Sequence, residues 1–198
     1  MKQQYHLITK AFKTNNMKKI KLFSLAFATI LGLSATAQKP VEVGGAPMYP
    51  NKNIIENAVN SKDHTTLVAA VKAAGLVETL QGSGPFTVFA PTNAAFDMLP
   101  AGTVPELLKQ ENKSMLTNVL TYHVVAGKYD SKSLMELIEK SNGKAMLKTV
   151  EGGTIYFTKK DNGIMLWDEK GGMAMVTTKD VYQSNGVIHV IDHVIMPK

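Results

Sequence analysis

The last dozen residues constrain the fold more than any other segment of the chain. Read with the two-residue period of a strand, residues 187–196 carry mostly apolar side chains on both faces. A strand with two apolar faces belongs in the interior of a sheet that is covered on both sides. Asn185-Gly186 marks a turn into this strand, and Pro197 ends it because proline has no N–H to donate. We therefore predict that the C-terminal segment is a central strand of the domain core.

The first residues of the chain, 1–37, have the pattern of a secretory leader. A positive segment at residues 17–21 precedes an apolar stretch at residues 22–33, and small residues up to Ala37 suit a cleavage site. Met17 is an alternative start, because a complete signal begins there. The apolar stretch is shorter than the ~20 residues that span a bilayer, so we expect no integral membrane segment in the mature chain. The expected location is the periplasm, the cell surface or the extracellular space.

The basic charge of the whole chain belongs to this leader. The sequence has 22 basic and 16 acidic residues, which gives a formal charge of +6. Six of the lysines and none of the acidic residues precede residue 38, so 16 basic and 16 acidic residues remain in the mature chain. A neutral chain lacks the basic surface that phosphate backbones require, so we expect no nucleic acid partner. The sequence contains no cysteine, which excludes disulfides, thiolate metal sites and a cysteine nucleophile.

The mature chain is predicted to form one α+β domain at residues 51–198, after a flexible segment at residues 38–50 that is rich in glycine and proline. Apolar residues at helical spacing dominate up to about residue 141. Short strands separated by Asn-Gly and Gly-Gly turns dominate after it. Helices early and a mostly antiparallel sheet late are typical of the α+β class.

Several positions carry helix-boundary signals. Asn51 or Asn53 can cap a first helix, and Asp63 can cap the next one, whose end is predicted at Gly75. Thr103 begins a Thr-x-x-Glu capping box. We therefore expect the first half of the domain to be built mainly from helices.

Three segments resemble the sequence boxes of fasciclin (FAS1) domains, in the order and spacing of that family. Residues 87–96 resemble the first box, Tyr122-His123 resembles the central Tyr-His pair, and residues 185–197 resemble the second box. The resemblance implies an α+β fold, a β-wedge of about seven mostly antiparallel strands with helices packed on it. It also implies a secreted or cell-surface protein associated with adhesion and matrix contact. Asn93 departs from the aspartate that many members carry, and this chain has one copy of a domain that animal matrix proteins repeat.

The resemblance also suggests a contact site at the central pair. In animal relatives the Tyr-His segment and its apolar neighbours are implicated in integrin contact, which here gives Tyr122, His123, Leu120 and Val124 as candidate binding residues. A structural interpretation is also open, because Tyr and His are often packed and hydrogen-bonded inside cores. We expect the pair to follow a helix and to open a strand, so that the two side chains point to opposite sides.

Six further residues of the boxes are expected to be structural. They are Pro91, Thr92, Asn93, Phe96, His189 and Asp192. Within a continuous strand His189 and His193 would be about 13 Å apart, too far for one metal ion. The same strand would place Asp192 on the opposite face, where it accepts hydrogen bonds from backbone or hydroxyl groups. We expect no metal, no cofactor and no catalytic residue.

These observations favour a non-catalytic interaction module whose partner is a surface or matrix protein or a polysaccharide. The alternative is a carrier that holds a small apolar ligand in a groove between the sheet and the helices. Trp167 and the nine methionines of the mature chain are candidates for the lining of such a groove. A third hypothesis, a hydrolase, is disfavoured because Ser83 lies in a loop before a strand, whereas a nucleophile elbow needs a strand before the serine and a helix after it.

Overall fold

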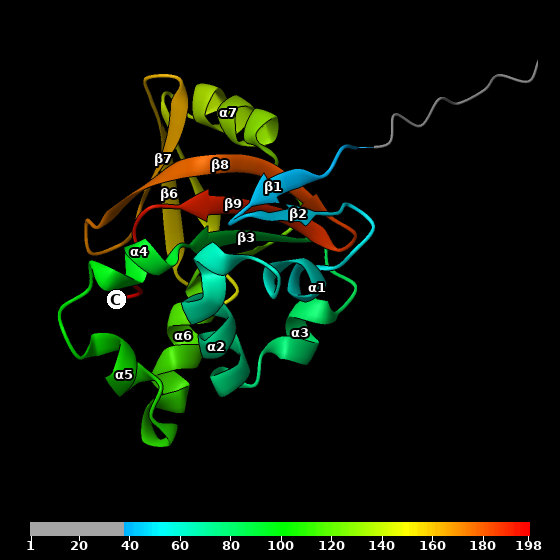
Figure 1. The fold of residues 1–198 in the computed structure, drawn as a ribbon. Coiled ribbons are helices and arrows are strands. Elements are labelled where there is room, and N and C mark those ends of the chain that lie inside the picture. Colours follow the sequence, from blue (N-terminus) through cyan, green and yellow to red (C-terminus); the bar gives the residue numbers. More distant parts are fainter. Residues whose placement is uncertain (1–37) are drawn as a thin grey trace, which may run out of the picture. The chain divides into compact units, whose positions relative to one another are not determined.

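The computed structural model describes residues 38–198, and the predicted leader at residues 1–37 lies outside the described residues. The strands are β1 (Val41–Val43), β2 (Ala46–Met48), β3 (Phe86–Pro91), β4 (Val124–Ala126), β5 (Lys144–Lys148), β6 (Thr154–Lys160), β7 (Gly163–Trp167), β8 (Met173–Gln183) and β9 (Gly186–Ile191). The first two form a hairpin, and the others form one sheet in the order β4-β3-β9-β8-β7-β6-β5 (Figure 1). Every neighbouring pair in this sheet is antiparallel except β3 and β9, which are parallel. The predicted α+β class and the predicted sheet of about seven mostly antiparallel strands are confirmed.

Helices occupy most of the first half of the domain, as the apolar spacing predicts. The α-helices are α1 (Ile54–Ala58), α2 (Thr65–Ala74), α3 (Val77–Gln81), α4 (Asn93–Asp97), α5 (Thr103–Leu107), α6 (Lys113–Tyr122) and α7 (Ser131–Lys140). Two 3₁₀ turns, η1 (Lys62–His64) and η2 (Gln110–Asn112), directly precede α2 and α6. Figure 1 shows α1, α2, α3 and α6 on one side of β3 and β9, and α7 on the other side. The sheet is therefore covered by helices on both sides of its central strands.

Two of the predicted helix boundaries are confirmed. Asn53 caps α1, because its side-chain oxygen accepts a hydrogen bond from the Glu56 N–H at 2.9 Å. The Glu56 carboxylate accepts in turn from the Asn53 N–H at 2.7 Å, which completes a capping box. Gly75 follows the last residue of α2 with a φ of 75°, the left-handed conformation that glycine adopts without steric cost.

Two predicted caps are wrong. Asp63 lies within η1, and the start of α2 is held by Asn93, whose side-chain oxygen accepts from the Thr66 N–H at 3.0 Å. Thr103 is the first residue of α5 rather than its N-cap. The N-cap of α5 is Gly102, which has the left-handed conformation with a φ of 84°. Local capping patterns predict neither feature, because Asn93 comes from a distant segment and Gly102 has no side chain that could form a cap.

Residues 38–50 contain a hairpin, so the expectation of a flexible segment there is wrong. β1 and β2 pair in antiparallel register, and Val43 and Met48 are buried in the same hydrophobic cluster as α1. Gly44 and Gly45 form the connecting turn, with φ values of 60° and 73°. The two glycines that suggested flexibility form a tight turn. The hairpin is held in place because Val43 and Met48 are buried.

β9 is the central strand that the apolar pattern of the C-terminus predicts. It lies between β3 and β8, and each of its six residues is buried. Ile188 and Val190 pack into one hydrophobic cluster, and Ile191 packs into another. The strand ends at Ile191, earlier than predicted, and residues 192–197 continue without strand pairing.

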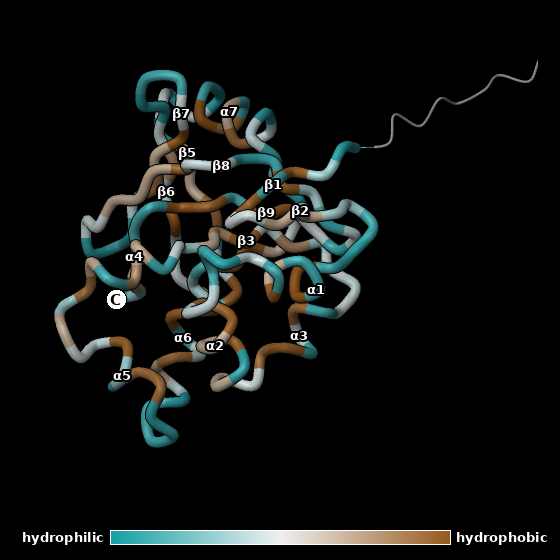
Figure 2. The backbone as a smooth tube through the Cα atoms, viewed as in Figure 1, coloured by the Kyte–Doolittle hydropathy of each residue, from teal (hydrophilic) through white to brown (hydrophobic). Residues whose placement is uncertain are grey.

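The sheet separates these two hydrophobic clusters, and apolar residues concentrate along its central strands and the helices beside them (Figure 2). The first cluster lies between the sheet and α1, α2, α3 and α6, and includes Val71, Leu120 and Ile188. The second includes Phe157 of β6 and residues of α7. After β5, the Val150 N–H donates to the Val124 carbonyl of β4 at 2.8 Å, so the two outer strands of the sheet approach each other. The sheet therefore curls around the second cluster.

Asn185 connects segments that are far apart in the sequence. Its side-chain oxygen accepts from the Ile54 N–H at 3.0 Å, and its side-chain nitrogen donates to the carbonyls of Leu80 and Gly82 at 2.8 Å each. Its backbone carbonyl accepts from the Phe86 N–H at 3.0 Å. This buried residue therefore fastens α1 and α3 to the turn before β9.

We predict that Asn185→Ala lowers the free energy of unfolding by about 1 to 3 kcal/mol, because the buried Ile54 N–H loses its partner. Urea denaturation followed by circular dichroism measures the loss. Asn60→Ala is the matched control: the Asn60 amide donates to a helix carbonyl in an exposed position, and its removal is expected to change stability by less than about 0.5 kcal/mol. Equal losses in the two variants would contradict the role of Asn185.

Candidate functional site

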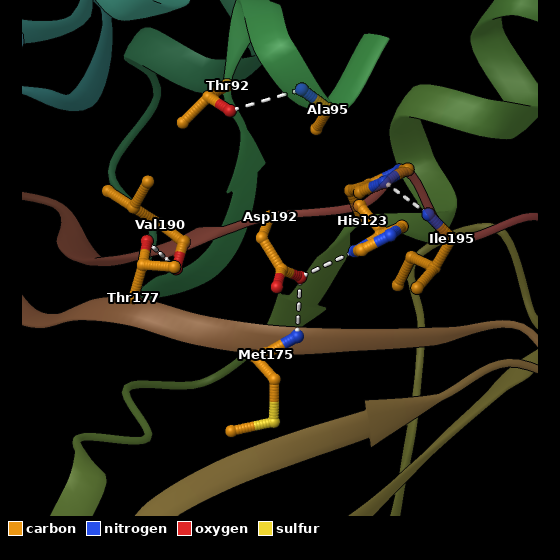
Figure 3. A network of polar contacts seen from close by, with 9 residues as sticks. Thr92, Ala95, His123, Met175, Thr177, Val190, Asp192 and Ile195 are labelled. Atoms are coloured by element: carbon orange, nitrogen blue, oxygen red, sulfur yellow. Dashed lines mark hydrogen bonds and ion pairs between the residues drawn. The ribbon is translucent and has the colours of Figure 1, made fainter. Parts of the chain in front are cut away.

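The residues of the first box hold the end of β3 against its neighbours. The Thr92 N–H donates to the Ile191 carbonyl of β9 at 3.3 Å, and the Thr92 hydroxyl accepts from the Ala95 N–H at 3.2 Å to cap α4 (Figure 3). Pro91 and Phe96 are buried. The Asn93 amide donates to a carbonyl of η1 at 2.8 Å, in addition to its contact with α2. These contacts are structural, as expected for this box.

Tyr122 is the last residue of α6, so the expectation that it opens a strand is wrong. Its side chain is completely buried in the second cluster. The hydroxyl donates to the Thr154 carbonyl at 2.7 Å and accepts from the Glu169 N–H at 3.3 Å. Burial raises the pKa of Tyr122 to about 12, so the ring is neutral and hydrogen-bonded at physiological pH.

His123 follows Tyr122 and is also buried. Its Nδ1–H donates to the Val119 carbonyl at 2.8 Å, and its Nε2 accepts from the Ile195 N–H at 3.3 Å (Figure 3). This pair of contacts requires the neutral ring with the proton on Nδ1. Burial lowers the pKa of His123 to about 4, in agreement with that protonation state. The histidine thus fastens the end of α6 to the segment after β9.

The proposed contact site at the central pair does not reach the surface. Leu120 and Val124 are each 6% exposed, and Tyr122 and His123 are buried more deeply still. The prediction that these four side chains bind a macromolecular partner directly is therefore wrong for the folded domain, because the partner would have to displace the core. Leu120, His123 and Val124 instead line an apolar cavity between the sheet and the helices.

The histidine of the second box has a structural role too. His189 is fully buried, its Nε2 donates to the Tyr129 carbonyl at 2.8 Å, and its Nδ1 accepts from the Asp180 N–H at 3.4 Å. The ring stacks on Phe89 with 5.7 Å between centroids. Burial lowers the pKa of His189, which keeps the ring neutral.

Asp192 accepts a backbone hydrogen bond, as expected, from the Met175 N–H of β8 at 2.7 Å (Figure 3). The same carboxylate oxygen accepts from Nδ1 of His193 at 2.8 Å. The expectation that a strand keeps the aspartate and the histidine apart is wrong, because β9 ends at Ile191 and the backbone bends after it. The pair is exposed and joins the C-terminal segment to β8.

The first cluster encloses an apolar cavity of about 70 Å³. Its lining comes from α1, α2, α3, α6, η1, β2, β3, β4 and β9, and includes Ile55, Val71, Leu80, Val88, Leu120 and Ile188. The space lies between the sheet and the helices, where the carrier hypothesis expects a groove. Trp167 is not part of it, and Met48 is the methionine that contributes to its lining.

A second histidine of the lining, His64, has a buried ring nitrogen without a hydrogen-bond partner among the described residues. The residue ends η1, lines the cavity and is 2% exposed. Its Nδ1 bonds to the hydroxyl of Ser61 at 2.9 Å, while its Nε2 is buried without a hydrogen-bond partner among the described residues. The Ala90 backbone acts to raise the pKa of His64. Burial outweighs this effect and lowers the pKa of His64.

Sequence reasoning did not single out His64. The signal it offered was a histidine three residues before Leu67, the first apolar position of the predicted helix, and this pattern does not distinguish a cavity-lining side chain from an exposed one. The distinction depends on how β3 packs against the start of α2.

A second candidate lies on the outer face of β5 to β8. Met146, Tyr156, Trp167 and Met173 are paired directly across these four strands, and directly paired residues project from the same face of a sheet. We refer to these four residues as the outer row. Met146 is 69% exposed and Met173 is 50% exposed, while the two aromatic side chains between them are half-buried. Alternate residues such as Phe157 point into the second cluster.

Between residues 38 and 198, no group of three or more His, Asp or Glu side chains is arranged to hold a metal ion. Over the same range, each helix is too short or too polar to cross a bilayer.

Comparison with known proteins agrees with this fold. The family model for the fasciclin domain matches residues 62–197. The chain is 43% identical to protein sll1483 of Synechocystis over 176 residues, which cover 88% of this chain and 91% of that protein. It is 37% identical to the immunogenic protein MPB70 of Mycobacterium bovis over 169 residues, 83% of this chain and 77% of the relative.

A solved structure shows the same fold. The FAS1 domain pair of the insect cell adhesion molecule Fasciclin I superposes with a TM-score of 0.66 at 18% identity, covering 73% of this chain and 51% of that one. At this level of identity the similarity concerns the fold alone.

The buried His123 predicts a pH-dependent stability. Its pKa is about 4 in the folded protein against 6.5 in the unfolded chain, so the unfolded state binds more protons between these values. Stability is therefore expected to fall as the pH drops from 7 to 4, with about 3 kcal/mol of the loss due to this residue. His64 and His189 act in the same direction.

Urea denaturation at a series of pH values measures this effect. His123→Asn is expected to be less stable at pH 7 but to lose less stability on acidification. Asn60→Ala, which removes an exposed side chain that does not titrate, is expected to retain the wild-type slope of stability against pH. If the free energy of unfolding of His123→Asn depends on pH as steeply as that of the wild type, His123 is not responsible for the pH dependence.

Proposed function

The chain belongs to the fasciclin domain family, and on this premise we propose that it is an exported, non-catalytic interaction module that contacts proteins of the cell surface or the extracellular matrix. Two observations support the proposal. A protein of the same fold is named as a cell adhesion molecule, and the N-terminal sequence has the pattern of a secretory leader.

The observation that carries the proposal is the outer row. Tyr, Trp and Met are enriched in protein interfaces, where rigid aromatic side chains contribute most of the binding energy. In the outer row the two aromatic residues occupy the centre, and the more exposed methionines occupy the two ends. Lys144 lies over the Tyr156 ring, with its ammonium 4.5 Å from the ring centroid, and adds a positive charge beside the apolar centre. A folded protein partner with an apolar patch and an acidic rim fits this arrangement.

We predict that beads coated with the protein retain cells of the producing organism and that Trp167→Ala lowers the affinity at least tenfold, because tryptophan at the centre of an interface is typically a hot spot. Met115→Ala is the control, since Met115 is 57% exposed on α6, outside the outer row. Both variants are first checked for an unchanged melting temperature. Equal retention by the two variants would contradict the role of the outer row.

Treatment of the cells distinguishes the two kinds of partner. Protease treatment is expected to abolish retention, whereas periodate oxidation of surface sugars is expected to leave it intact. The opposite result would show that the partner is a polysaccharide and would overturn the protein-partner proposal.

A second candidate function, a carrier of a small apolar ligand, is favoured by the apolar cavity. A cavity of about 70 Å³ exceeds the roughly 10 to 15 Å³ that one water requires, and its lining is almost entirely hydrocarbon. Apolar cavities of this kind bind small apolar molecules because few polar atoms are available to hold water. Such binding is compatible with the interaction module, since the cavity and the outer row involve different strands.

We predict that toluene raises the melting temperature by about 3 to 6 °C at a free concentration ten times its Kd, because a ligand that binds only the folded state stabilises it. Ala58→Leu extends a side chain into the cavity and is expected to abolish this increase. Ala73→Leu, at an exposed position on α2 that does not line the cavity, is the control. Absence of the increase in the wild type, by calorimetry as well as by melting, would refute the carrier function.

A further inference from the structure

We propose that Met165, Met173 and Met175 form a binding site for Cu⁺ on the outer face of β7 and β8, with the indole ring of Trp167 beside the ion. The site shares Trp167 and Met173 with the outer row, but it requires no protein partner and does not depend on the proposed function. Two kinds of observation support it: the register of the two strands, and the directions in which two of the side chains extend.

The register of β7 and β8 brings the four side chains to one face of the sheet. Met165 is directly paired with Met175, and Trp167 is directly paired with Met173. Directly paired residues project from the same face. The residues that alternate with them are buried in the second cluster: Ile164, Leu166 and Ala174. The four side chains therefore point away from that cluster, and three thioether groups and one indole occupy adjacent positions on the outer face.

The spacing within the sheet lets the three sulfur atoms reach one ion. Diagonal neighbours such as Met165 and Met173 have Cβ atoms about 7 to 8 Å apart, so the midpoint between them is roughly 4 Å from each. A methionine sulfur lies two bonds beyond Cβ, on a side chain with three rotatable bonds. Met173 is 50% exposed, so its side chain can turn toward this midpoint without displacing core residues. An ion held just above the sheet is therefore within reach of all three methionines.

Two contacts show how the neighbouring side chains lie around Met165. The Trp167 indole N–H donates to the Thr158 hydroxyl at 3.1 Å, and Thr158 is directly paired with Met165. The indole therefore lies alongside Met165. A Cβ atom added to Gly163 would lie 3.3 Å from the ε-methyl group of Met175. The side chain of Met175 therefore extends from β8 over β7, into space that the glycine leaves open.

The chemistry of these side chains selects the kind of ion. Thioether sulfur is a soft, uncharged ligand that favours Cu⁺, whereas Mg²⁺ and Ca²⁺ prefer oxygen ligands. The ring face of a tryptophan attracts a cation that lies over it. The ion binds in its Cu⁺ state, so the proposal includes no redox step.

The charges around the site favour a monovalent ion. Lys144 lies over the Tyr156 ring on this face, and Lys160 is directly paired with Gly163. These positive charges repel a divalent ion more strongly than a monovalent one. The Asp192 carboxylate accepts a hydrogen bond from the N–H of the methionine at position 175, at 2.7 Å, and places one negative charge at the opposite edge of β8.

The experiment titrates the purified protein with Ag⁺, a redox-stable ion that shares the preference of Cu⁺ for thioether ligands. Trp167 is the one tryptophan of the sequence, so its fluorescence reports on the site, and we expect one equivalent of Ag⁺ to quench it. Met165→Leu and Met175→Leu are each expected to raise the Kd at least about tenfold, because even the loss of an outer partner of a metal ligand typically costs 10- to 100-fold in affinity. Met146→Leu is the matched control: Met146 lies on the same face, is 69% exposed and belongs to β5, so the Kd is expected to stay unchanged.

A second measurement uses the wild type alone and does not depend on the folding of the variants. Ag⁺ is expected to shift the ε-methyl ¹³C resonances of Met165, Met173 and Met175 and to leave that of Met146 in place. Cu⁺, supplied without oxygen and with a reductant, is expected to shift the same resonances, and Zn²⁺ is expected to shift none of them. Absence of quenching in the wild type would overturn the proposal. So would a Kd that is the same in the two site variants as in Met146→Leu, or shifts confined to other methionines.

Discussion

The burial of both faces of β9 is the constraint on which the rest of the structure depends. A strand in this position needs apolar cover above and below, which the helices α1, α2, α3 and α6 supply on one side and the curled half of the sheet with α7 supplies on the other. β9 also pairs in parallel with β3, although about 94 residues separate the two strands. The chain between them contains four of the seven described α-helices, α4 to α7, and five further strands of the same sheet, β4 to β8.

The division into two clusters explains where the polar side chains lie. The polar residues of the boxes stand where helices and loops join the sheet, and they satisfy backbone groups that the ends of the elements leave unpaired. Asn185 bonds to three backbone groups, and His123 and His189 each use both ring nitrogens. The hydrogen-bonding groups of these side chains already have partners within the domain. The side chains therefore contribute to the specificity of the fold and have no free group for a binding partner. His64 has the same location at an element end but keeps one nitrogen free.

The sequence predicts those features that depend on local pattern. The apolar side chains on both faces of residues 187–196 indicate a central strand, and the Asn53 and Gly75 signals mark real helix ends because their hydrogen-bond partners lie within a few residues. It fails where the deciding contact comes from a distant segment. Asp63 has the right identity for a cap, yet Asn93 supplies the bond to α2. The cavity depends on how helices and strands from distant parts of the sequence pack together, and local sequence patterns do not contain that information.

The register of the sheet also shows why the two candidate sites are physically separate. The cavity is bordered by β3, β4 and β9, whereas the outer row belongs to β5, β6, β7 and β8. The strand that links these two halves is β8, which pairs with β7 at Met173 to Met175 and with β9 from Val176 onward, with register shifts between Val176 and Val181. Such shifts disrupt the ladder locally and bend the strand, so the two halves of the sheet are not joined by one regular ladder. Occupation of the cavity and contact at the outer row are therefore expected to be thermodynamically independent, so that one small domain can hold a ligand inside and a partner outside without either binding event altering the other.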